Sequence, residues 1–504
     1  MSAYSLSLNN LSFRYDTNEQ YLFRDVNLSF SYGWTGIIGR NGSGKTTLLK
    51  LISGELLPES GIVYNGHVAL FCEQRMDSAP LLLSDFIYSY DIESIKLKHM
   101  LNIEDHWLDR WYYLSYGEKK RLQIAEAIWR NPKILLVDEP TNHLDLKSRK
   151  CLLNLLKEYN GIGIIVSHDR YVMDNLCTSS VFIDLNGVKQ FKSSYSISCE
   201  QKLINDESLL TEYMNMKKGY RKLKKEYANR KHKAAQADAK RSKKHTAKKD
   251  YDAKDKIEGG ICSGRDAIAG KLQSQLKGRL NKKLTELSEF NITKTKKLDI
   301  WIDCRELKRN SIFNLEEGCI KLGSDKTLSY PELSMNSSNR IGITGDNGSG
   351  KTTLINKILN VMCVDKEDII FLPQEIDAIS SNRFFKEVKL NLDSSGLAKV
   401  MNLVKHLGSE PKGMLTSEMI SPGEVRKLML AVGILKKPKI IIMDEPTNHL
   451  DIDSIKCLEN AINDTPCGII MISHDVYFLK KLTNERWDFM KINDRSYFVE
   501  KKYW

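Results

Sequence analysis

Short apolar runs recur along the chain and end in polar or charged residues. They include residues 34–39 (WTGIIG), 133–139 (KILLVDE), 161–166 (GIGIIV), 340–345 (RIGITG) and 439–445 (KIIIMDE). Each run has the length of a strand, and continuous apolar runs are typical of strands that are buried on both faces. The runs at 34–39 and 340–345 lead into glycine-rich loops, and the segments after these loops, TLLKLISG and TLINKIL, have helical periodicity. The pattern predicts an α/β fold with a parallel sheet covered by helices on both faces.

The same motifs occur twice, in the same order and 306 residues apart. GRNGSGKTT at 39–47 recurs as GDNGSGKTT at 345–353, and DEPTNHLD at 138–145 recurs unchanged at 444–451. LSYGEKKRL and VSHDRY in the first copy correspond to ISPGEVRKL and ISHDVY in the second. A constant offset indicates a duplicated domain, with an unrelated segment between the two copies.

Each GxxxxGK[ST] loop follows a predicted strand and opens a predicted helix. Such loops bind phosphates through backbone N–H groups, their lysine reaches the β- and γ-phosphates, and the hydroxyl ligates Mg²⁺. The predicted nucleotide-binding residues are Gly39, Asn41, Gly42, Gly44, Lys45, Thr46 and Thr47 in the first loop, and Gly345, Asn347, Gly348, Gly350, Lys351, Thr352 and Thr353 in the second. A glycine-rich turn without a ligand would explain one such loop, but not two in this context.

Pairs of acids end two of the predicted strands. Asp138 and Asp444 are expected to hold Mg²⁺, and the adjacent Glu139 and Glu445 are expected to polarise the attacking water as general bases. Acids at strand ends can also serve only to keep a buried edge of the sheet hydrated. The repetition of the whole motif argues against this alternative.

Four further residues are candidates because of their positions. His168 and His474 each follow a predicted strand and are expected to contact the γ-phosphate, although a single histidine is often structural. Gln74 and Gln374, downstream of the loop lysines, are candidate ligands of Mg²⁺ and water.

The LSYGE and ISPGE motifs provide a second anion site in each copy. Ser115 with Gly117, and Ser421 with Gly423, open predicted helices and can offer a hydroxyl, backbone N–H groups and the positive helix end to a phosphate. Each copy already has a phosphate-binding loop, so the second site makes sense if it serves the nucleotide of the other copy. We therefore expect two ATP molecules between head-to-tail copies.

The segment between the copies has a helical pattern. An apolar seam with alternating spacings of four and three residues contains Leu209, Tyr213, Met216, Tyr220, Leu223 and Tyr227, and continues through Ala234 and Ala237. A returning stripe contains Leu272, Leu276, Leu280, Leu284 and Leu287. These patterns predict an antiparallel helical hairpin with its tip within 246–266, and an ascending helix of about 45 residues would reach roughly 65 Å.

The net charge of +12 is concentrated in this segment. Residues 201–290 hold 24 basic and 12 acidic side chains, and residues 215–249 hold 15 basic and two acidic ones. A one-signed excess favours a polyanionic partner over a merely solvated helix surface. The expected RNA contacts are Lys240, Arg241, Lys243, Lys244, Lys248, Lys249, Tyr251, Lys254, Lys256 and Arg265.

Composition narrows the class of protein. Charged residues make up 28% of the 504 residues and hydrophobic residues 41%, as in a globular protein. No apolar run reaches the roughly 20 residues needed to span a bilayer, and no secretory signal is expected at the N-terminus. Ten scattered cysteines without a CxxC pair indicate a cytoplasmic protein with reduced thiols and argue against a zinc or iron–sulfur site.

The ordered set of motifs, present twice, resembles a tandem ATP-binding-cassette protein. DEPTNHLD in both copies, no membrane-spanning segment and a charged linker resemble the ABC-F family of ribosome-associated ATPases, over essentially the whole chain. The resemblance implies an α/β fold with two P-loop ATP-binding-cassette domains, residues 1–195 and 296–504, joined by a basic helical linker, residues 196–295. It also implies ATP hydrolysis with ATP and Mg²⁺ as cofactors.

The family resemblance implies a mechanism as well. ATP closes the two cassettes, the closed form binds the ribosomal E site, and the linker points toward the P-site tRNA and the peptidyl-transferase centre. Tyr15 in SFRYD corresponds to the aromatic residue that stacks on adenine. Lys321, which is not aromatic, stands at the corresponding position of the second copy, and Pro422 is a second departure that leaves Ser421 and Gly423 in place.

Within the family, the short segment between Gln74 and Leu114 is informative. These 40 residues leave no room for the arm that many housekeeping members insert there. This favours the antibiotic-resistance branch, which dislodges drugs from the ribosome, over a housekeeping or stalled-ribosome factor. A transporter subunit or a DNA-repair ATPase is a more distant alternative. The expected partners are large-subunit rRNA and P-site tRNA without a membrane, and the chain is expected to be a monomer.

Overall fold

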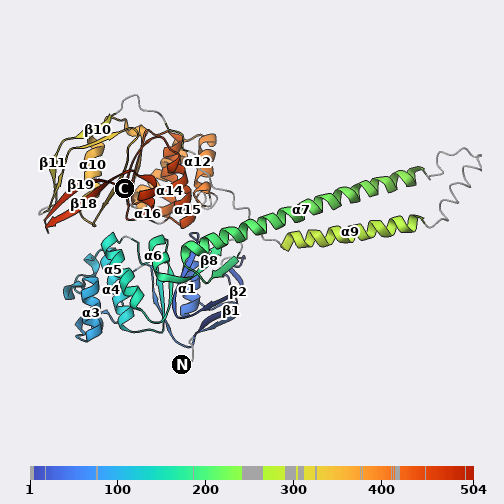
Figure 1. Ribbon diagram of the computed structural model, residues 1–504, viewed down its shortest axis with the longest axis horizontal. Coiled ribbons are helices and arrows are strands. Elements are labelled where there is room, and N and C mark those ends of the chain that lie inside the picture. The colour runs from blue at the N-terminus through green and yellow to red at the C-terminus, as the bar shows by residue number, and fades with distance from the viewer. Residues whose placement is uncertain are drawn as a thin grey trace, which may run out of the picture. The chain divides into compact units, whose positions relative to one another are not determined.

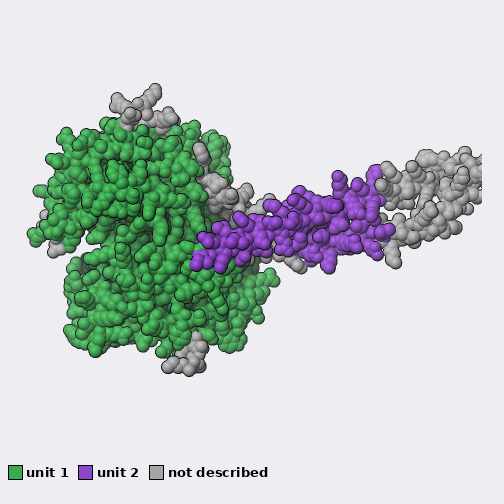
Figure 2. Space-filling view, in the orientation of Figure 1, with its two compact units in different colours: residues 1–196, 295–504 green, residues 197–294 purple. Residues whose placement is uncertain are grey.

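A computed structural model describes most of the chain. The described residues are 5–16, 19–74, 76, 78–142, 144–184, 187–240, 265–289, 302–304, 311–323, 326–374, 376, 378–409, 411, 414, 421–448, 450–493 and 495–504. They form two compact units (Figure 2). One unit contains residues 1–196, here called the first half, together with residues 295–504, here called the second half; the other contains residues 197–294.

The first half contains two sheets. A three-stranded antiparallel sheet has the order β2-β1-β4, with β1 Leu6–Phe13, β2 Phe23–Phe30 and β4 Ser60–Tyr64. A six-stranded sheet has the order β5-β6-β7-β3-β8-β9, with β3 Gly33–Gly39, β5 Ala69–Cys72, β6 Ile134–Asp138, β7 Ile162–Val166, β8 Cys177–Asp184 and β9 Gly187–Phe191. All pairs in this larger sheet are parallel except β8 with β9.

Helices follow the strands of this sheet (Figure 1). They are α1 Lys45–Ser53, α2 Leu83–Tyr88, α3 Ile92–Leu101, α4 Tyr116–Trp129, α5 Leu146–Glu158 and α6 Arg170–Leu176, with short 3₁₀ turns at Asp105–Trp107 and Trp111–Tyr113. Every residue of β6 and β7 is buried, as expected for central strands that are covered on both faces. Leu48, Leu49 and Ile52 of α1 pack with Leu136 and Ile164 of these strands in one apolar core.

The second half repeats this arrangement. Its eight-stranded sheet has the order β11-β12-β19-β18-β14-β17-β16-β15 and comprises β11 Gly318–Leu322, β12 Lys326–Tyr330, β14 Arg340–Gly345, β15 Ile369–Leu372, β16 Ile440–Asp444, β17 Gly468–Ile472, β18 Glu485–Asn493 and β19 Ser496–Tyr503. Strands β10 Ser311–Leu315 and β13 Leu333–Asn336 form a separate antiparallel pair. The helices are α10 Lys351–Val361, α11 Ala378–Asn391, α12 Ser394–His406, α14 Pro422–Leu435, α15 Ile452–Asn463 and α16 Val476–Leu482, with a 3₁₀ turn at Lys366–Asp368.

The central strand order is the same in both halves: β15-β16-β17-β14-β18-β19 corresponds to β5-β6-β7-β3-β8-β9. The predicted parallel strands are confirmed, but each sheet also carries antiparallel strands at one edge. In the second half, β12 pairs in parallel with β19, so strands that form a separate sheet in the first half extend the main sheet. The structure thus confirms the predicted class of two P-loop α/β domains in tandem.

The second unit is built on two helices, α7 Tyr195–Lys240 and α9 Arg265–Glu289. They lie side by side (Figure 1), and Nζ of Lys283 lies 3.6 Å from the point that a Cβ on Gly219 would occupy. The seam residues Tyr213, Met216 and Tyr220 are half-buried. The described helices include none that is both long enough and apolar enough to cross a membrane.

The leucine stripe of α9 is less regular than predicted. Leu276 is buried, whereas Leu272 and Leu284 are 43% and 52% exposed. Four residues turn an α-helix by more than a full revolution, so leucines spaced by four drift around the axis and cannot all face one neighbour.

Candidate nucleotide-binding sites

The two glycine-rich loops have the conformation of a phosphate cradle. Gly42 and Gly44 have φ values of 79° and 95°, and Gly348 and Gly350 have 73° and 95°, a region that other residues adopt only with strain. At Gly44, a Cβ would also lie 2.8 Å from the ring of Phe23. These positions therefore require glycine.

The helices that the loops open lack a side-chain cap. Gly44 and Gly350 are the N-cap residues of α1 and α10, and neither can supply a capping side chain. The first backbone N–H groups of each helix are therefore suited to an external anion such as a phosphate. Lys45 Nζ donates to the carbonyl oxygens of Gly39 (2.8 Å) and Arg40 (3.2 Å), and Lys351 makes the equivalent bonds to Gly345 and Asp346 (both 2.8 Å). The residues at each loop fit the phosphates of a nucleoside triphosphate.

Each loop threonine lies against the acid that ends a central strand. Thr46 Oγ1 donates to Asp138 Oδ2 over 2.6 Å, and Thr352 Oγ1 donates to Asp444 Oδ2 over 2.7 Å. The threonines are exposed and the aspartates are buried. A hydroxyl and a carboxylate are hard oxygen ligands of the kind that Mg²⁺ uses together with phosphate oxygens and waters. The donor set fits Mg²⁺ at both sites. Burial raises the pKa of both aspartates, and the threonine hydrogen bonds oppose this rise.

The second acid of each pair has a strained backbone. Glu139 and Glu445 have φ values of 44° and 49°, which are uncommon for residues other than glycine and often mark functional sites. Their N–H groups donate to Val166 and Ile472 on the adjacent strand, both over 2.9 Å, which holds the turn in place.

The candidate general bases contact the candidate histidines in both halves. His168 Nε2 lies 3.3 Å from Glu139 Oε1, and His474 Nε2 lies 3.5 Å from Glu445 Oε1. In each pair the histidine backbone N–H also donates to the other carboxylate oxygen over 3.4 Å. Sequence reasoning placed these residues in one site, and the structure brings them together.

Burial controls the protonation of these pairs. It raises the pKa of Glu139 to about 8 and that of Glu445 to about 7. Burial and the neighbouring loop lysines lower the pKa of both histidines to about 3. The imidazoles are therefore neutral near pH 7, so their contacts with the glutamates are not ion pairs. The hydrogen bonds to the glutamates come from the backbone N–H groups of the histidines.

The signature motifs form well-capped helix starts. Ser115 caps α4 and Ser421 caps α14, each with a reciprocal bond to the glutamate three residues later, Glu118 or Glu424. Pro422 occupies the first turn of α14, where its missing N–H would in any case lack a partner within the helix. This departure from LSxGE therefore preserves the helix start.

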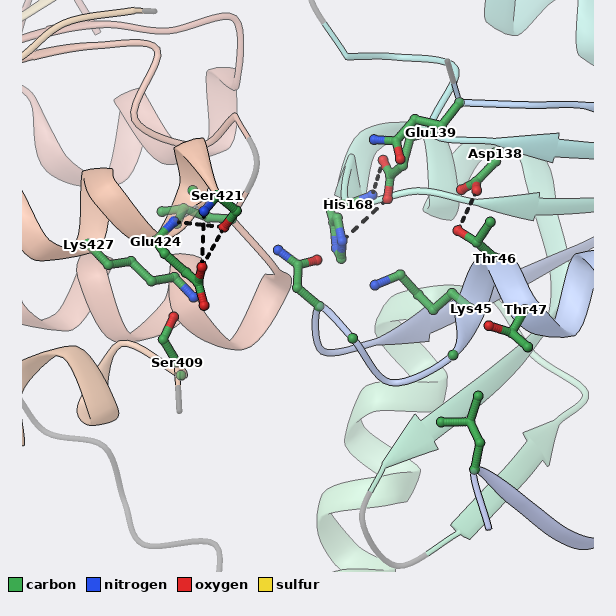
Figure 3. A pocket seen from close by; sticks show the side chains of 18 of the residues that line it. Lys45, Thr46, Thr47, Asp138, Glu139, His168, Ser409, Ser421, Glu424 and Lys427 are labelled. Atoms are coloured by element: carbon green, nitrogen blue, oxygen red, sulfur yellow. Dashed lines mark hydrogen bonds and ion pairs between the residues drawn. The ribbon is translucent and has the colours of Figure 1, made fainter. Parts of the chain in front are cut away.

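A cavity of about 1110 Å³ lies between the loop of the first half and the signature helix of the second half (Figure 3). Predicted residues that line it are Tyr15, Asn41, Gly42, Gly44, Lys45, Thr46, Thr47, Gln74, Asp138, Glu139 and His168 from the first half, and Ser421 and Gly423 from the second half. Figure 3 shows Ser421 and Lys427 on the side opposite Lys45 and His168. The first composite site thus has the head-to-tail arrangement that the repeated motifs suggested.

The aspartates that end the two DEPTNHLD motifs reach across to the opposite loops. The backbone N–H of Asn41 donates to Asp451 Oδ2 over 3.1 Å, and that of Asn347 donates to Asp145 Oδ2 over 3.4 Å. Each loop therefore contacts the DEPTNHLD motif of the opposite half, and the contact is equivalent in the two sites. By this correspondence, the residues predicted for the second site are Ser115, Gly117, Gly345, Asn347, Gly348, Gly350, Lys351, Thr352, Thr353, Gln374, Asp444, Glu445 and His474.

Tyr15 lies at the edge of the first cavity. Its ring is 42% exposed and meets Phe13 edge to face, with centroids 5.0 Å apart. Its hydroxyl lies 2.9 Å from Thr47 Oγ1. An exposed ring fixed in this way can stack on a base. Lys321 occupies the corresponding position in β11.

Some lining residues were not predicted. Lys427, Glu424 and Ser409 of the second half line the first cavity. A sequence signal existed for Lys427, because Arg121 is a cation at the same position of the first copy. Ser409 belongs to no repeated motif.

Of the predicted RNA-contact residues, two lie within the described residues. The backbone of Lys240 ends α7 and that of Arg265 begins α9. The other predicted contacts, Arg241, Lys243, Lys244, Lys248, Lys249, Tyr251, Lys254 and Lys256, lie outside the described residues.

Comparisons with known proteins identify the family of the chain. The family model described as "ABC transporter" matches residues 23–142 and 328–448. The ribosome protection protein VmlR of Bacillus subtilis (strain 168) is 30% identical over 490 residues, which cover 95% of this chain and 86% of VmlR. The erythromycin resistance ATP-binding protein MsrA of Staphylococcus epidermidis is 29% identical over 500 residues, which cover 97% of this chain and 98% of MsrA.

A solved structure shares the fold. A model of ribosome-bound archaeal Pelota and ABCE1 contains a chain that matches with a TM-score of 0.60 and 18% identity, covering 98% of this chain and 78% of that one. Two P-loop domains with composite sites define an ATP-binding-cassette ATPase. The chain belongs to the ABC-F family of these proteins.

Proposed function

We propose that this protein binds the ribosome in its ATP-closed state and protects it from antibiotics. In this proposal the closed protein occupies the E site, and residues 197–294 extend toward the P-site tRNA and the peptidyl-transferase centre, where drug is displaced. The observation that carries the proposal is the 30% identity to a ribosome protection protein over 95% of the chain. The basic charge of residues 215–249 supports an RNA partner.

The nucleotide sites would supply the energy for docking. The loop N–H groups and Lys45 hold the phosphates, and Ser421 and Gly423 close the site from the other half only when the halves are together. ATP bound in both sites would therefore stabilise the closed form. Thr46 and Asp138 would hold Mg²⁺, with Gln74 as a further candidate. When bound, this ion neutralises charge on the phosphates.

Hydrolysis would then reopen the protein. Glu139 accepts a proton from the attacking water while the oxygen of that water bonds to the γ-phosphorus, and the bond between the β,γ-bridging oxygen and the γ-phosphorus breaks. Burial favours the protonated form of Glu139, and the positive charge of Lys45 counteracts this most strongly. The His168 backbone N–H donates to the carboxyl group and holds it at the site, and the neutral ring lies 3.3 Å from the other carboxyl oxygen. Glu445 and His474 have the same roles in the second site.

The closed state can be trapped by removing both bases. The double variant Glu139→Gln/Glu445→Gln should lose hydrolysis by a factor of about 10²–10⁴ and cosediment with ribosomes when ATP is present. Lys45→Ala/Lys351→Ala in the same background is the matched control, because it removes the phosphate contacts. A trapped variant that stays in the ribosome-free fraction with ATP would contradict the proposed cycle.

Drug susceptibility tests the protective role. Expression in a sensitive host should raise the inhibitory concentration of at least one drug that binds the peptidyl-transferase region or exit tunnel. The hydrolysis-deficient double variant should give no protection. Unchanged susceptibility to all such drugs, with ATP-dependent ribosome binding retained, would favour a housekeeping or stalled-ribosome factor.

A further inference from the structure

Arg149 reaches from the first half to the second ATP site. It lies in the first turns of α5, four residues after Asp145, and its side chain is only 12% exposed. Its Nη1 donates to the backbone carbonyl of His474 over 3.3 Å and to Asp169 Oδ2 over 3.1 Å. Its Nε donates to the carbonyl of Leu144 over 3.0 Å. Two acceptors of the first half, the Leu144 carbonyl and the Asp169 carboxylate, thus hold the guanidinium that contacts the second half.

The residue that Arg149 contacts is central to the second site. The His474 backbone N–H and Nε2 both face the carboxyl group of Glu445, and Nε2 also lies 3.2 Å from Asn347 Oδ1 in the loop. The His474 carbonyl is a further polar group of this residue, and Arg149 donates to it. Arg149 therefore restrains the residue that orients the general base.

The first site has a different residue at this position. The 306-residue offset pairs Arg149 with Ile455, whereas Asp145 pairs with Asp451 and Ser148 with Ser454. Ile455 is 2% exposed and belongs to an apolar core of the second half. An isoleucine has no hydrogen-bond donor, so it cannot hold the carbonyl of His168 as Arg149 holds that of His474.

We propose that Arg149 is a positioning residue for hydrolysis at the second ATP site, acting from the opposite half through the backbone of His474, and that the two sites are therefore chemically inequivalent. Arginine suits this role because its planar guanidinium keeps its charge and can bind a carbonyl and a carboxylate together. The proposal concerns ATP hydrolysis and is independent of the ribosome.

Each site can be measured alone. Glu139→Gln leaves the second site active, and Glu445→Gln leaves the first site active. In the Glu139→Gln background, Arg149→Ile should lower kcat by about ten- to a hundredfold, because a misplaced general base loses its geometry. KM for ATP should change far less, because among the described residues of the second half Arg149 donates a hydrogen bond only to the backbone of His474 and to none of the residues of the phosphate-binding loop. In the Glu445→Gln background the fractional loss of kcat should be much smaller.

Two matched variants separate positioning from general support of the interface. Lys150→Ile removes one charge from the next, exposed position of the same helix and should leave kcat unchanged in both backgrounds. Arg149→Lys keeps a cation that can reach only part of the acceptor set, so it should recover part of the lost kcat at the second site. Equal losses in both backgrounds, or a loss confined to KM, would overturn the proposal. Thermal unfolding of each variant shows whether the chain still folds, and Arg149→Lys remains a test if Arg149→Ile does not.

Discussion

Arg170 of the first half forms an ion pair with Glu459 of the second half, and both side chains are largely buried. Glu459 is also 2.9 Å from Lys481 of its own half. The 306-residue offset pairs Arg170 with Val476 and Glu459 with Leu153. The two halves thus meet through a charge pair on one side and carry apolar residues at the corresponding positions on the other.

This pair gives a double-variant prediction. Glu459→Leu leaves Arg170 buried without its partner and should destabilise the closed form by about 3 kcal/mol. The combination Arg170→Val/Glu459→Leu places on this side the residues that the chain already uses on the other, and should restore most of the loss. The measurement is the thermal midpoint with ATP in the Glu139→Gln/Glu445→Gln background. If the double variant is as unstable as Glu459→Leu alone, burial of Arg170 without its partner is not the cause of the destabilisation.

A second prediction concerns pH and the stability of the nucleotide-free protein. Burial raises the pKa of Glu139 to about 8, well above its ordinary value of 4.5. Between these values the folded state binds a proton that the unfolded state has lost, so stability falls as the pH rises through this window. Glu139→Gln cannot ionise, so it should stabilise the protein more at about pH 9 than at about pH 5.

Glu445 provides the internal comparison for this titration. Its pKa is raised only to about 7, so the benefit of Glu445→Gln should level off at a lower pH than that of Glu139→Gln. The check is denaturant unfolding across pH with a chelator and without nucleotide. A benefit that does not depend on pH would show that the glutamates are ionised throughout.

A third prediction tests Tyr15 as the adenine platform of the first site. In a Lys351→Ala background, where only the first loop is intact, Tyr15→Ala should weaken binding of a fluorescent ATP analogue by about five- to a hundredfold. Tyr15→Phe keeps the ring and loses only the hydroxyl contact with Thr47, so it should bind nearly as well as the parent. In the complementary Lys45→Ala background, Lys321→Ala should have little effect, because no ring is removed. Equal losses for Tyr15→Phe and Tyr15→Ala would assign the effect to the hydroxyl.

A fourth prediction concerns residues 246–266, the predicted tip of the linker. Shortening this segment should abolish drug protection while basal ATP hydrolysis stays near the parent level, because none of these residues is among those predicted for either nucleotide site. Inhibitory concentrations and phosphate release are measured on the same set of shortened variants. Full protection by the shortened chain would remove the tip from the mechanism.

Local chemistry explains why so much of each half could be predicted from the sequence. The loops, the strand-end acids and the signature serines are specified by residues within a few positions of one another. Gly44 needs a positive φ, Thr46 needs an acid at the end of a buried strand, and Ser115 needs Glu118 three residues later. Each of these requirements therefore produces a recognisable short motif in the sequence.

The contact between Arg149 and His474 leaves no such pattern. Arg149 and His474 are 325 residues apart, and nothing near either residue identifies the other as its partner. Comparison of the two copies shows that Arg149 differs from Ile455, but only the structure shows that the difference reaches an ATP site. The edge strands were missed for a similar reason, because the pairing of β12 with β19 joins residues from distant parts of the second half.

The charge pair between Arg170 and Glu459 also bears on the history of the duplicated chain. Two first halves set face to face would bury Arg170 against Leu153, and two second halves would leave Glu459 facing Val476. Lys481 of the same half would still pair with Glu459, but Arg170 has its acid only in the mixed arrangement, so a pair of first halves is disfavoured by the unmatched arginine. At this contact the halves are complementary, and a copy of the first half in place of the second would leave Arg170 without its acid.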